Sequence, residues 1–154
     1  MNPPQQDINS LIGKCVYLAS RSPLHNGYTI GTFVASFLPG ISLNQFRYFE
    51  RNGQPLGIAV WAWLTDDISE RYAAGGYMPP AEEWNQGKNL WFMEFLSPFD
   101  STEAMLEDLR AGIFKNDIGR GIKRNDDGSI RAIKKYYGVD ALRKAREKSS
   151  GKGN

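Results

Sequence analysis

Apolar residues recur at a rough helical period near the start of the chain. In INSLIGKCVYLAS (8–20) this spacing predicts a helix. Ser22-Pro23 should end it, because the residue before a proline avoids the helical region. A second helix is predicted over TIGTFVASFL (29–38), ended by Pro39-Gly40.

The middle of the chain has the pattern of a sheet. ISLNQFRYFER (41–51) and PLGIAVWAWL (55–64) flank Asn52-Gly53, a strong hairpin signal. The run from Ile58 to Leu64 is almost wholly apolar, which predicts a strand covered on both faces. A short helix closed by Gly75-Gly76 should follow, and then an apolar strand in NLWFMEFLSPF (89–99).

The last third predicts a helix, a hairpin and a helix. In the first helix (100–114), Asp100 and Glu103 have capping-box spacing, and Met105, Leu109 and Ile113 form one stripe. A hairpin turns around 126–128, and a basic helix covers 139–148. This order indicates an α+β or mixed α/β fold with a mostly antiparallel central sheet. We expect one domain over 1–148 and a disordered tail over 149–154.

Composition narrows the class of protein. No apolar run approaches the length of a membrane span, the N-terminus lacks the pattern of a secretory signal, and Cys15 is the single cysteine. These features favour the cytoplasm. The net charge is +2, yet the chain from Leu109 onward contains thirteen Lys or Arg and only five Asp or Glu. Such a basic end predicts an anionic partner or a solvated surface.

The chain lacks the common signatures of phosphate and metal sites. There is no P-loop, no cysteine pair and no histidine cluster, so we expect no metal. A Cys15–His25 pair is disfavoured, because Cys15 lies in an apolar helical pattern that suits a packing cysteine.

Glu94 is the anomalous residue, because it lies within the apolar strand LWFMEFL. Strand alternation predicts that it shares a face with Phe92 and Leu96. An unpaired carboxylate there would cost several kcal/mol, so Glu94 should have a partner or face a cleft. One interpretation is an arginine salt bridge or an edge position in water. The other is a carboxylate that orients an imidazole, and His25 is the only histidine. Taken alone, His25 is more simply a structural loop residue.

At this point the sequence resembles a known family. LASRSPLHNGY (18–28) resembles the motif around the active-site histidine of the RTX toxin-activating lysine acyltransferases, the hemolysin-activating protein C family. The likeness continues in order through 36–67 and 82–99, and more loosely through 121–138. It covers roughly residues 10–138. Several rare residues fall in register: Pro39, Trp61, Trp84, Trp91 and Pro98.

The resemblance implies a cytoplasmic enzyme that moves a fatty acyl group from acyl carrier protein to internal lysines of an RTX protoxin, which activates the toxin. It also implies a variant of the GCN5-related N-acetyltransferase fold. Dimers are known in the family, so a homodimer is one expectation. The family's essential histidine falls on His25, its catalytic aspartate on Glu94, and a polar asparagine on Ser36.

Chemistry supports these roles. A lysine amine must lose a proton before it attacks a thioester, and an imidazole suits that task near neutral pH. We therefore expect His25 to act as the base and Glu94 to stabilise the imidazolium, with an acyl-His25 intermediate as the competing route. The substrate and its acyl chain are expected near six residues: Ser22, Phe33, Ser36, Phe37, Trp61 and Phe92.

A missing motif is consistent with the carrier-protein donor that the resemblance implies. RNGQPLG (51–57) reads as a hairpin turn without the following helix that would cradle a coenzyme A pyrophosphate, which fits a carrier-protein donor and no bound cofactor. Acyl carrier proteins are acidic, so a basic docking surface is expected. Its candidates are Arg120, Lys123, Arg124, Arg131, Lys134 and Lys135.

Two other classes of function stay open. One is a non-catalytic family member that binds carrier or toxin without turnover. The other is a nucleic-acid-binding module, for which Tyr136 and Tyr137 beside Lys134 and Lys135 give some aromatic and basic interleaving. No recognisable nucleic-acid motif accompanies it.

Overall fold

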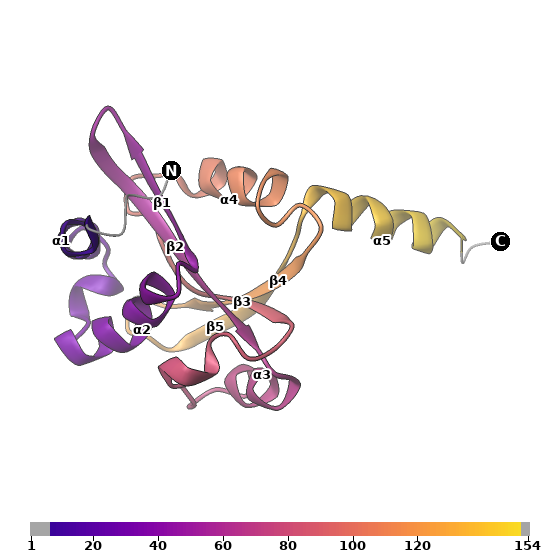
Figure 1. Ribbon diagram of the computed structural model, residues 1–154, viewed down its shortest axis with the longest axis horizontal. Helices are drawn as coiled ribbons and strands as arrows, with labels where there is room; N and C mark the ends of the chain where they lie inside the picture. The colour runs from indigo at the N-terminus through magenta and orange to yellow at the C-terminus, as the bar shows by residue number, and fades with distance from the viewer. Residues whose placement is uncertain (1–6, 152–154) are drawn as a thin grey trace.

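The computed structural model describes residues 7–151. Five strands form one sheet in the order β1-β2-β3-β4-β5, and helices lie on both of its faces (Figure 1). The predicted mixed α+β class is confirmed. No helix in the described range is long and apolar enough to cross a membrane.

The first two strands form the predicted hairpin. β1 (Phe46–Arg51) pairs antiparallel with β2 (Gln54–Leu64). Asn52 and Gly53 turn between them with φ of 52° and 78°, the left-handed values that favour these residue types. β2 lies inside the sheet and is buried on both faces, as its apolar run predicted.

The other three strands make the sheet mixed. β3 (Asn89–Leu96) pairs antiparallel with β2 but parallel with β4 (Ile118–Arg124), and β4 forms a hairpin with β5 (Ile130–Tyr137). The sheet therefore contains a parallel pair where the sequence predicted a mostly antiparallel arrangement. The parallel pairing covers only Leu90–Phe92 against Gly119–Gly121. Beyond it the two strands have no paired residues, and a cleft opens there.

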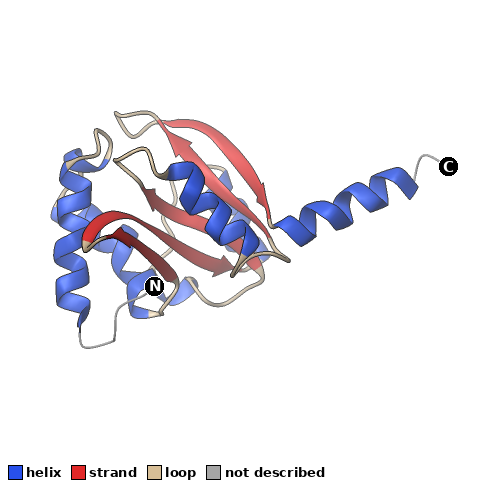
Figure 2. Ribbon diagram, turned by 90° about the horizontal axis from the view of Figure 1, so that it is seen from above, coloured by secondary structure: helices blue, strands red, loops and turns tan. Residues whose placement is uncertain are grey.

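Two apolar clusters cover the two faces of the sheet. The larger cluster joins the sheet to α1 (Ile8–Ser20), α2 (Ile30–Ser42) and α3 (Asp66–Ala73). The smaller one joins it to α4 (Thr102–Ala111) and Phe114. Short 3-10 turns occur at His25–Gly27 and Ala81–Glu83. α5 (Val139–Gly151) projects away from the sheet (Figures 1 and 2).

The predicted end of the second helix at Pro39-Gly40 is wrong, because α2 continues through both residues to Ser42. Gly40 is needed for packing. A Cβ at this position would collide with Cγ1 of Val60 and lie 3.0 Å from the carbonyl oxygen of Gln45. The glycine therefore lets the helix approach β2 closely, and the chain leaves the helix only after this contact.

The predicted capping box at Asp100 is also wrong. α4 begins at Thr102 after Ser101, and no side chain caps it. Asp100 has a φ of 60°, which belongs to the preceding turn. The stripe is only partly correct, because Met105 and Leu109 are buried whereas Ile113 lies beyond the helix and is 51% exposed.

The C-terminal helix runs further than its apolar pattern predicted. α5 extends through Ser149 and Ser150 to Gly151. Residues 152–154, the remainder of the predicted disordered tail, lie outside the described residues.

Candidate active site

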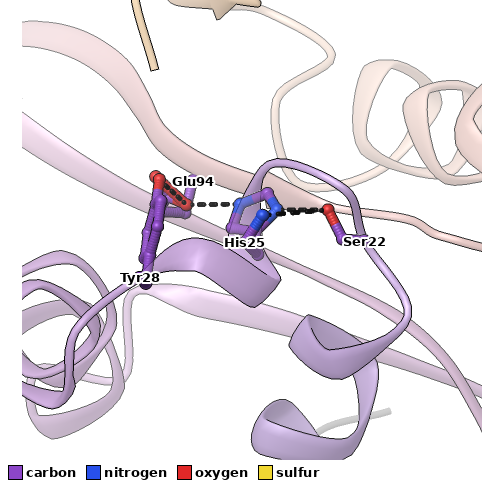
Figure 3. Close-up of polar contacts among 4 residues, drawn as sticks. All are labelled: Ser22, His25, Tyr28 and Glu94. Carbon is purple, nitrogen blue, oxygen red and sulfur yellow. Dashed lines mark hydrogen bonds and ion pairs between the residues drawn. The ribbon is translucent and has the colours of Figure 1, made fainter. Parts of the chain in front are cut away.

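His25 lies in a short turn between two helices (Figure 3). α1 ends at Ser20, as Ser22-Pro23 predicted, and His25 begins the 3-10 turn that follows. The next helix starts after Thr29, whose side chain accepts a hydrogen bond from the backbone N–H of Thr32 at 3.0 Å. Helix ends on both sides therefore fix the backbone that carries the imidazole.

Glu94 reaches His25 because β3 contains a bulge. Val60 pairs with Glu94 and Trp61 pairs with Phe92, so Met93 is an extra residue without a cross-strand partner. The bulge reverses the alternation and places Glu94 opposite Val60, on the face covered by α1 and α2. Phe92 belongs to the cluster on the other face. The prediction that Phe92 and Glu94 share a face is therefore wrong.

Glu94 has the partner that its burial requires. Its Oε2 atom lies 2.7 Å from Nε2 of His25, and the two residues are only 8% and 7% exposed. Since a carboxylate only accepts hydrogen bonds, the neutral imidazole carries its hydrogen on Nε2. Among the ion pairs of residues 7–151, Glu94 is joined to His25 and to no arginine.

Ser22 holds the other nitrogen of the ring. Its Oγ atom lies 2.7 Å from Nδ1 of His25 and accepts a longer hydrogen bond, of 3.3 Å, from the backbone N–H of His25. The serine hydroxyl therefore donates to Nδ1, whose lone pair is free in this tautomer. In this arrangement a carboxylate holds one ring nitrogen and a hydroxyl contacts the other. An imidazole held in this way can take a proton from the hydroxyl and return it.

Tyr28 is a fourth member of the site that the sequence did not single out. Its hydroxyl donates to Oε1 of Glu94 at 2.8 Å (Figure 3). Burial, and then the charge of Glu94, raise the pKa of Tyr28, so its hydroxyl stays a donor. Two donors thus share the Glu94 carboxylate. The signal in the sequence was weak, because Tyr28 is one of seven tyrosines.

His25 lies between two cavities of different character. One is the cleft of about 240 Å³ where β3 and β4 separate, and polar or charged groups such as Ser97, Lys123, Arg124 and Asp126 line it. The other is an apolar groove of about 560 Å³ between α1 and α2. Residues 7–151 contain no cluster of three His, Cys, Asp or Glu side chains that could hold a metal ion.

The predicted acyl-chain residues fall in different places. Phe33 lines the apolar groove and stacks on buried Phe37 at a centroid distance of 4.8 Å, and Phe37 lies 6.0 Å from the ring of His25. Ser36 is buried in α2. Phe92 lines the β3–β4 cleft. Trp61 packs on Phe114 on the opposite side of the sheet, away from His25.

The six predicted docking cations lie on two strands and two faces. The β4–β5 register pairs Arg120 with Lys135 and Gly121 with Lys134, so Lys134 and Lys135 point to opposite faces. Arg120 donates to Oγ of Ser69 at 2.7 Å. Burial, and then the charges of Lys134 and Arg131, lower the pKa of Lys123. Arg124, which donates to the carbonyl oxygen of Gly128, lines the cleft together with Lys123.

These features define a class of site: a buried acid–histidine pair, with a serine hydroxyl on the second ring nitrogen, that lines a cleft in a mixed α+β fold. The RTX toxin acyltransferase family model matches residues 4–137, so the chain belongs to this family. The resemblance noted in the sequence is therefore confirmed.

Individual relatives agree with this assignment. The chain is 30% identical over 108 residues to lysine-acyltransferase RtxC of Vibrio cholerae, covering 70% of this chain and 71% of the relative. It is 25% identical over 128 residues to protein-lysine myristoyltransferase HlyC of Escherichia coli, covering 83% and 75%. It is also 28% identical over 130 residues to an uncharacterized protein of Synechocystis, covering 82% and 88%.

Proposed function

We propose that this protein is a protein-lysine fatty acyltransferase that moves an acyl chain from acyl carrier protein to internal lysines of an RTX protoxin. The observation that carries the proposal is the contact of 2.7 Å between Nε2 of His25 and Oε2 of Glu94, in a chain whose relatives are named lysine acyltransferases. The reaction belongs in the cytoplasm, where carrier protein and unactivated protoxin meet. The fold is proposed to be a variant of the GCN5-related N-acetyltransferase fold.

The contacts of His25 support a role as the general base. Nε2–H donates to Glu94, and the lone pair of Nδ1 faces the hydroxyl of Ser22. A proton from the substrate ammonium therefore reaches Nδ1 through Ser22, or directly when this hydroxyl turns aside. Glu94 stabilises the imidazolium that forms. Its Oε2 atom reaches His25 from a bulged strand, at the position where the resemblance implies an aspartate.

The step balances as an aminolysis of a thioester. The neutral amine of the lysine attacks the carbonyl carbon, a C–N bond forms and the C–S bond breaks. The leaving thiolate takes the proton that His25 holds, which restores the neutral imidazole, and the second proton that the nitrogen loses on becoming an amide passes to solvent. No redox partner is needed.

A covalent route is the competing mechanism. Nδ1 of His25 lies within hydrogen-bond distance of Ser22, which is also the geometry that activates a serine nucleophile. Single turnover with labelled acyl carrier protein separates these routes. Label on His25 or Ser22 identifies a covalent intermediate, whereas label that passes to the lysine without appearing on the enzyme supports direct transfer.

Acyl transfer to a lysine-bearing fragment of the cognate protoxin tests the proposal. We expect transfer by the unaltered protein and a loss of about 10²–10⁴-fold for His25→Ala, as for removal of a general base. A folded protein without transfer would instead support a binding role. Equal activity in His25→Ala would remove His25 from the mechanism.

A further inference from the structure

His25 is the single residue shared by two cavities of opposite polarity. Of the residues lining the β3–β4 cleft and those lining the α1–α2 groove, only His25 belongs to both sets. The cleft carries charged and hydroxyl groups, including Lys123 and Arg124. The groove is lined mainly by apolar side chains: Ile12, Val16, Ile30, Phe33, Val34 and Leu38.

This arrangement matches the chemistry of an acyl thioester on a carrier arm. Such a donor has a polar arm with an anionic phosphodiester on one side of the reacting carbonyl, and an apolar tail on the other. The carbonyl must lie next to His25 if the proposed function holds. A polar cleft and an apolar groove that meet at this imidazole are therefore matched to the two halves of the donor.

The surface of the groove also calls for an apolar occupant. Ile30 is 85% exposed, Val16 is 53% exposed and Val34 is 43% exposed, and all three line it. Such contiguous apolar exposure marks a binding surface more often than an ordinary solvent face. The groove volume of about 560 Å³ lies within the range of about 300–1,000 Å³ that is usual for ligand pockets.

We propose that the groove between α1 and α2 holds the fatty acyl chain of the donor, with Val16, Ile30 and Phe33 as determinants of its length. This inference rests on the proposed function and assigns a place to the substrate tail. The polar arm then lies in the β3–β4 cleft, so the tail and the arm leave His25 in different directions. Of the acyl-chain residues predicted from the sequence, the groove includes Phe33 but neither Trp61 nor Phe92.

The quantity to be measured is the preference of the enzyme for acyl chains of different length. Transfer is compared for octanoyl, myristoyl and palmitoyl carrier protein with two altered proteins. Val16→Trp fills the groove, and Ile30→Asp places a charge in it without disturbing a buried position. Each buried methylene adds about fourfold to apolar binding, so both changes should lower the ratio of kcat/KM for palmitoyl to kcat/KM for octanoyl by more than about tenfold.

A matched control is available in a neighbouring apolar groove. Leu43 is 42% exposed and lines a groove between α2 and residues 78–82 that does not reach His25. Leu43→Trp should therefore leave the length preference as it is. An unchanged preference in Ile30→Asp and Val16→Trp, or an equal shift in Leu43→Trp, would overturn the assignment. So would an equal loss with all donors.

Binding of the fluorescent fatty acid cis-parinaric acid separates this inference from the proposed function. Binding that Ile30→Asp weakens and Leu43→Trp does not, in a protein that transfers no acyl group, would support the groove and defeat the enzyme assignment. Normal transfer with unchanged length preference and unchanged probe binding would defeat the groove alone. Light scattering measures the mass of the particle in solution. If Val16→Trp changes this mass but not the binding of the probe, a second copy of the chain covers the groove, and the assignment of the groove to the acyl chain is overturned.

Discussion

The Nε2 atom of His25 and the Oε2 atom of Glu94 lie 2.7 Å apart, although 69 residues separate them in the chain. The bulge at Met93 makes the contact, since it places Glu94 on the face that α1 and α2 cover. The hydroxyl of Tyr28 donates to Glu94 and the hydroxyl of Ser22 donates to His25. These two hydrogen bonds complete a chain of four polar side chains in an otherwise apolar part of the fold.

Substitutions at Glu94 should separate the effect of its negative charge from the effect of its side-chain length. Glu94→Gln removes the negative charge but keeps the length, and should lower kcat by about 10²–10³-fold, because the imidazolium loses its counter-charge. Glu94→Asp keeps the charge and draws the carboxylate back by one methylene, so the loss should be smaller. Single-turnover transfer rates measure both. A larger loss in Glu94→Asp than in Glu94→Gln would mean that position matters more than charge.

Tyr28 is expected to position Glu94 and not to contact the substrate amine. Tyr28→Phe removes the donor to Oε1, and a hydrogen bond to a charged group contributes about 1.5–3 kcal/mol, so kcat should fall by at least about tenfold. KM for the carrier protein should stay the same. Tyr17→Phe, at a 39% exposed position, is the control. An altered KM with unchanged kcat would point to substrate binding instead.

Lys134 and Lys135 form a natural pair for testing the docking surface. They are adjacent but point to opposite faces of the β4–β5 hairpin, and only Lys134 lies with the cleft-lining Lys123. Lys134→Glu should therefore weaken the affinity for carrier protein more than Lys135→Glu, and low salt should enlarge the difference. Titrations of labelled carrier protein at two ionic strengths measure this. Equal effects would argue for a surface that spans both faces.

The pKa of Lys123 offers a second test of the same group of cations. Its pKa is lowered by burial and then by the charges of Lys134 and Arg131. Lys134→Glu replaces a repelling cation with an anion and should raise the pKa of Lys123 towards its usual value. NMR titration of the lysine side-chain resonances detects the change, and Lys135→Glu should have a smaller effect. No movement in Lys134→Glu would mean that Lys134 does not contribute to the lowered pKa of Lys123.

Gly40 should be among the glycines least tolerant of replacement. Gly40→Ala forces a Cβ against Val60, and overpacking of this kind costs about 1–3 kcal/mol in the free energy of unfolding. Gly13→Ala, in the interior of α1 with no atom within 4 Å of the added Cβ, should instead stabilise the fold by about 0.5–1 kcal/mol. Urea unfolding measures both, and similar values would mean that α2 moves to accommodate the methyl group.

Cys15 should be chemically silent in the folded protein. Burial raises the pKa of its thiol to about 12, above its ordinary value near 9. Between these two values the unfolded chain loses this proton and the folded chain keeps it, so stability falls as the pH rises through this window. Iodoacetamide at pH 8 should label the thiol only in denaturant. Rapid labelling of the native protein would mean that α1 opens locally.

Local patterns in the sequence were sufficient for most elements. The helical period in 8–20, the turn at Asn52-Gly53 and the apolar run of β2 depend on neighbouring residues, and each was correct. The sequence also identified His25 and Glu94 as residues that need an explanation. Pro39 misled the prediction, because its usual effect on a helix is local whereas the packing of Gly40 on β2 is not.

Only the tertiary structure decided how these parts meet. The bulge at Met93 and the parallel pairing of β3 with β4 depend on register between distant strands, and local propensity carries no information about register. One extra residue in β3 moved Glu94 to the other face. Tyr28 joined the site for the same reason, since its partner lies 66 residues away. The sequence therefore determined which residues are proposed to carry the chemistry, and the packing of the sheet against α1 and α2 decided which of their atoms touch.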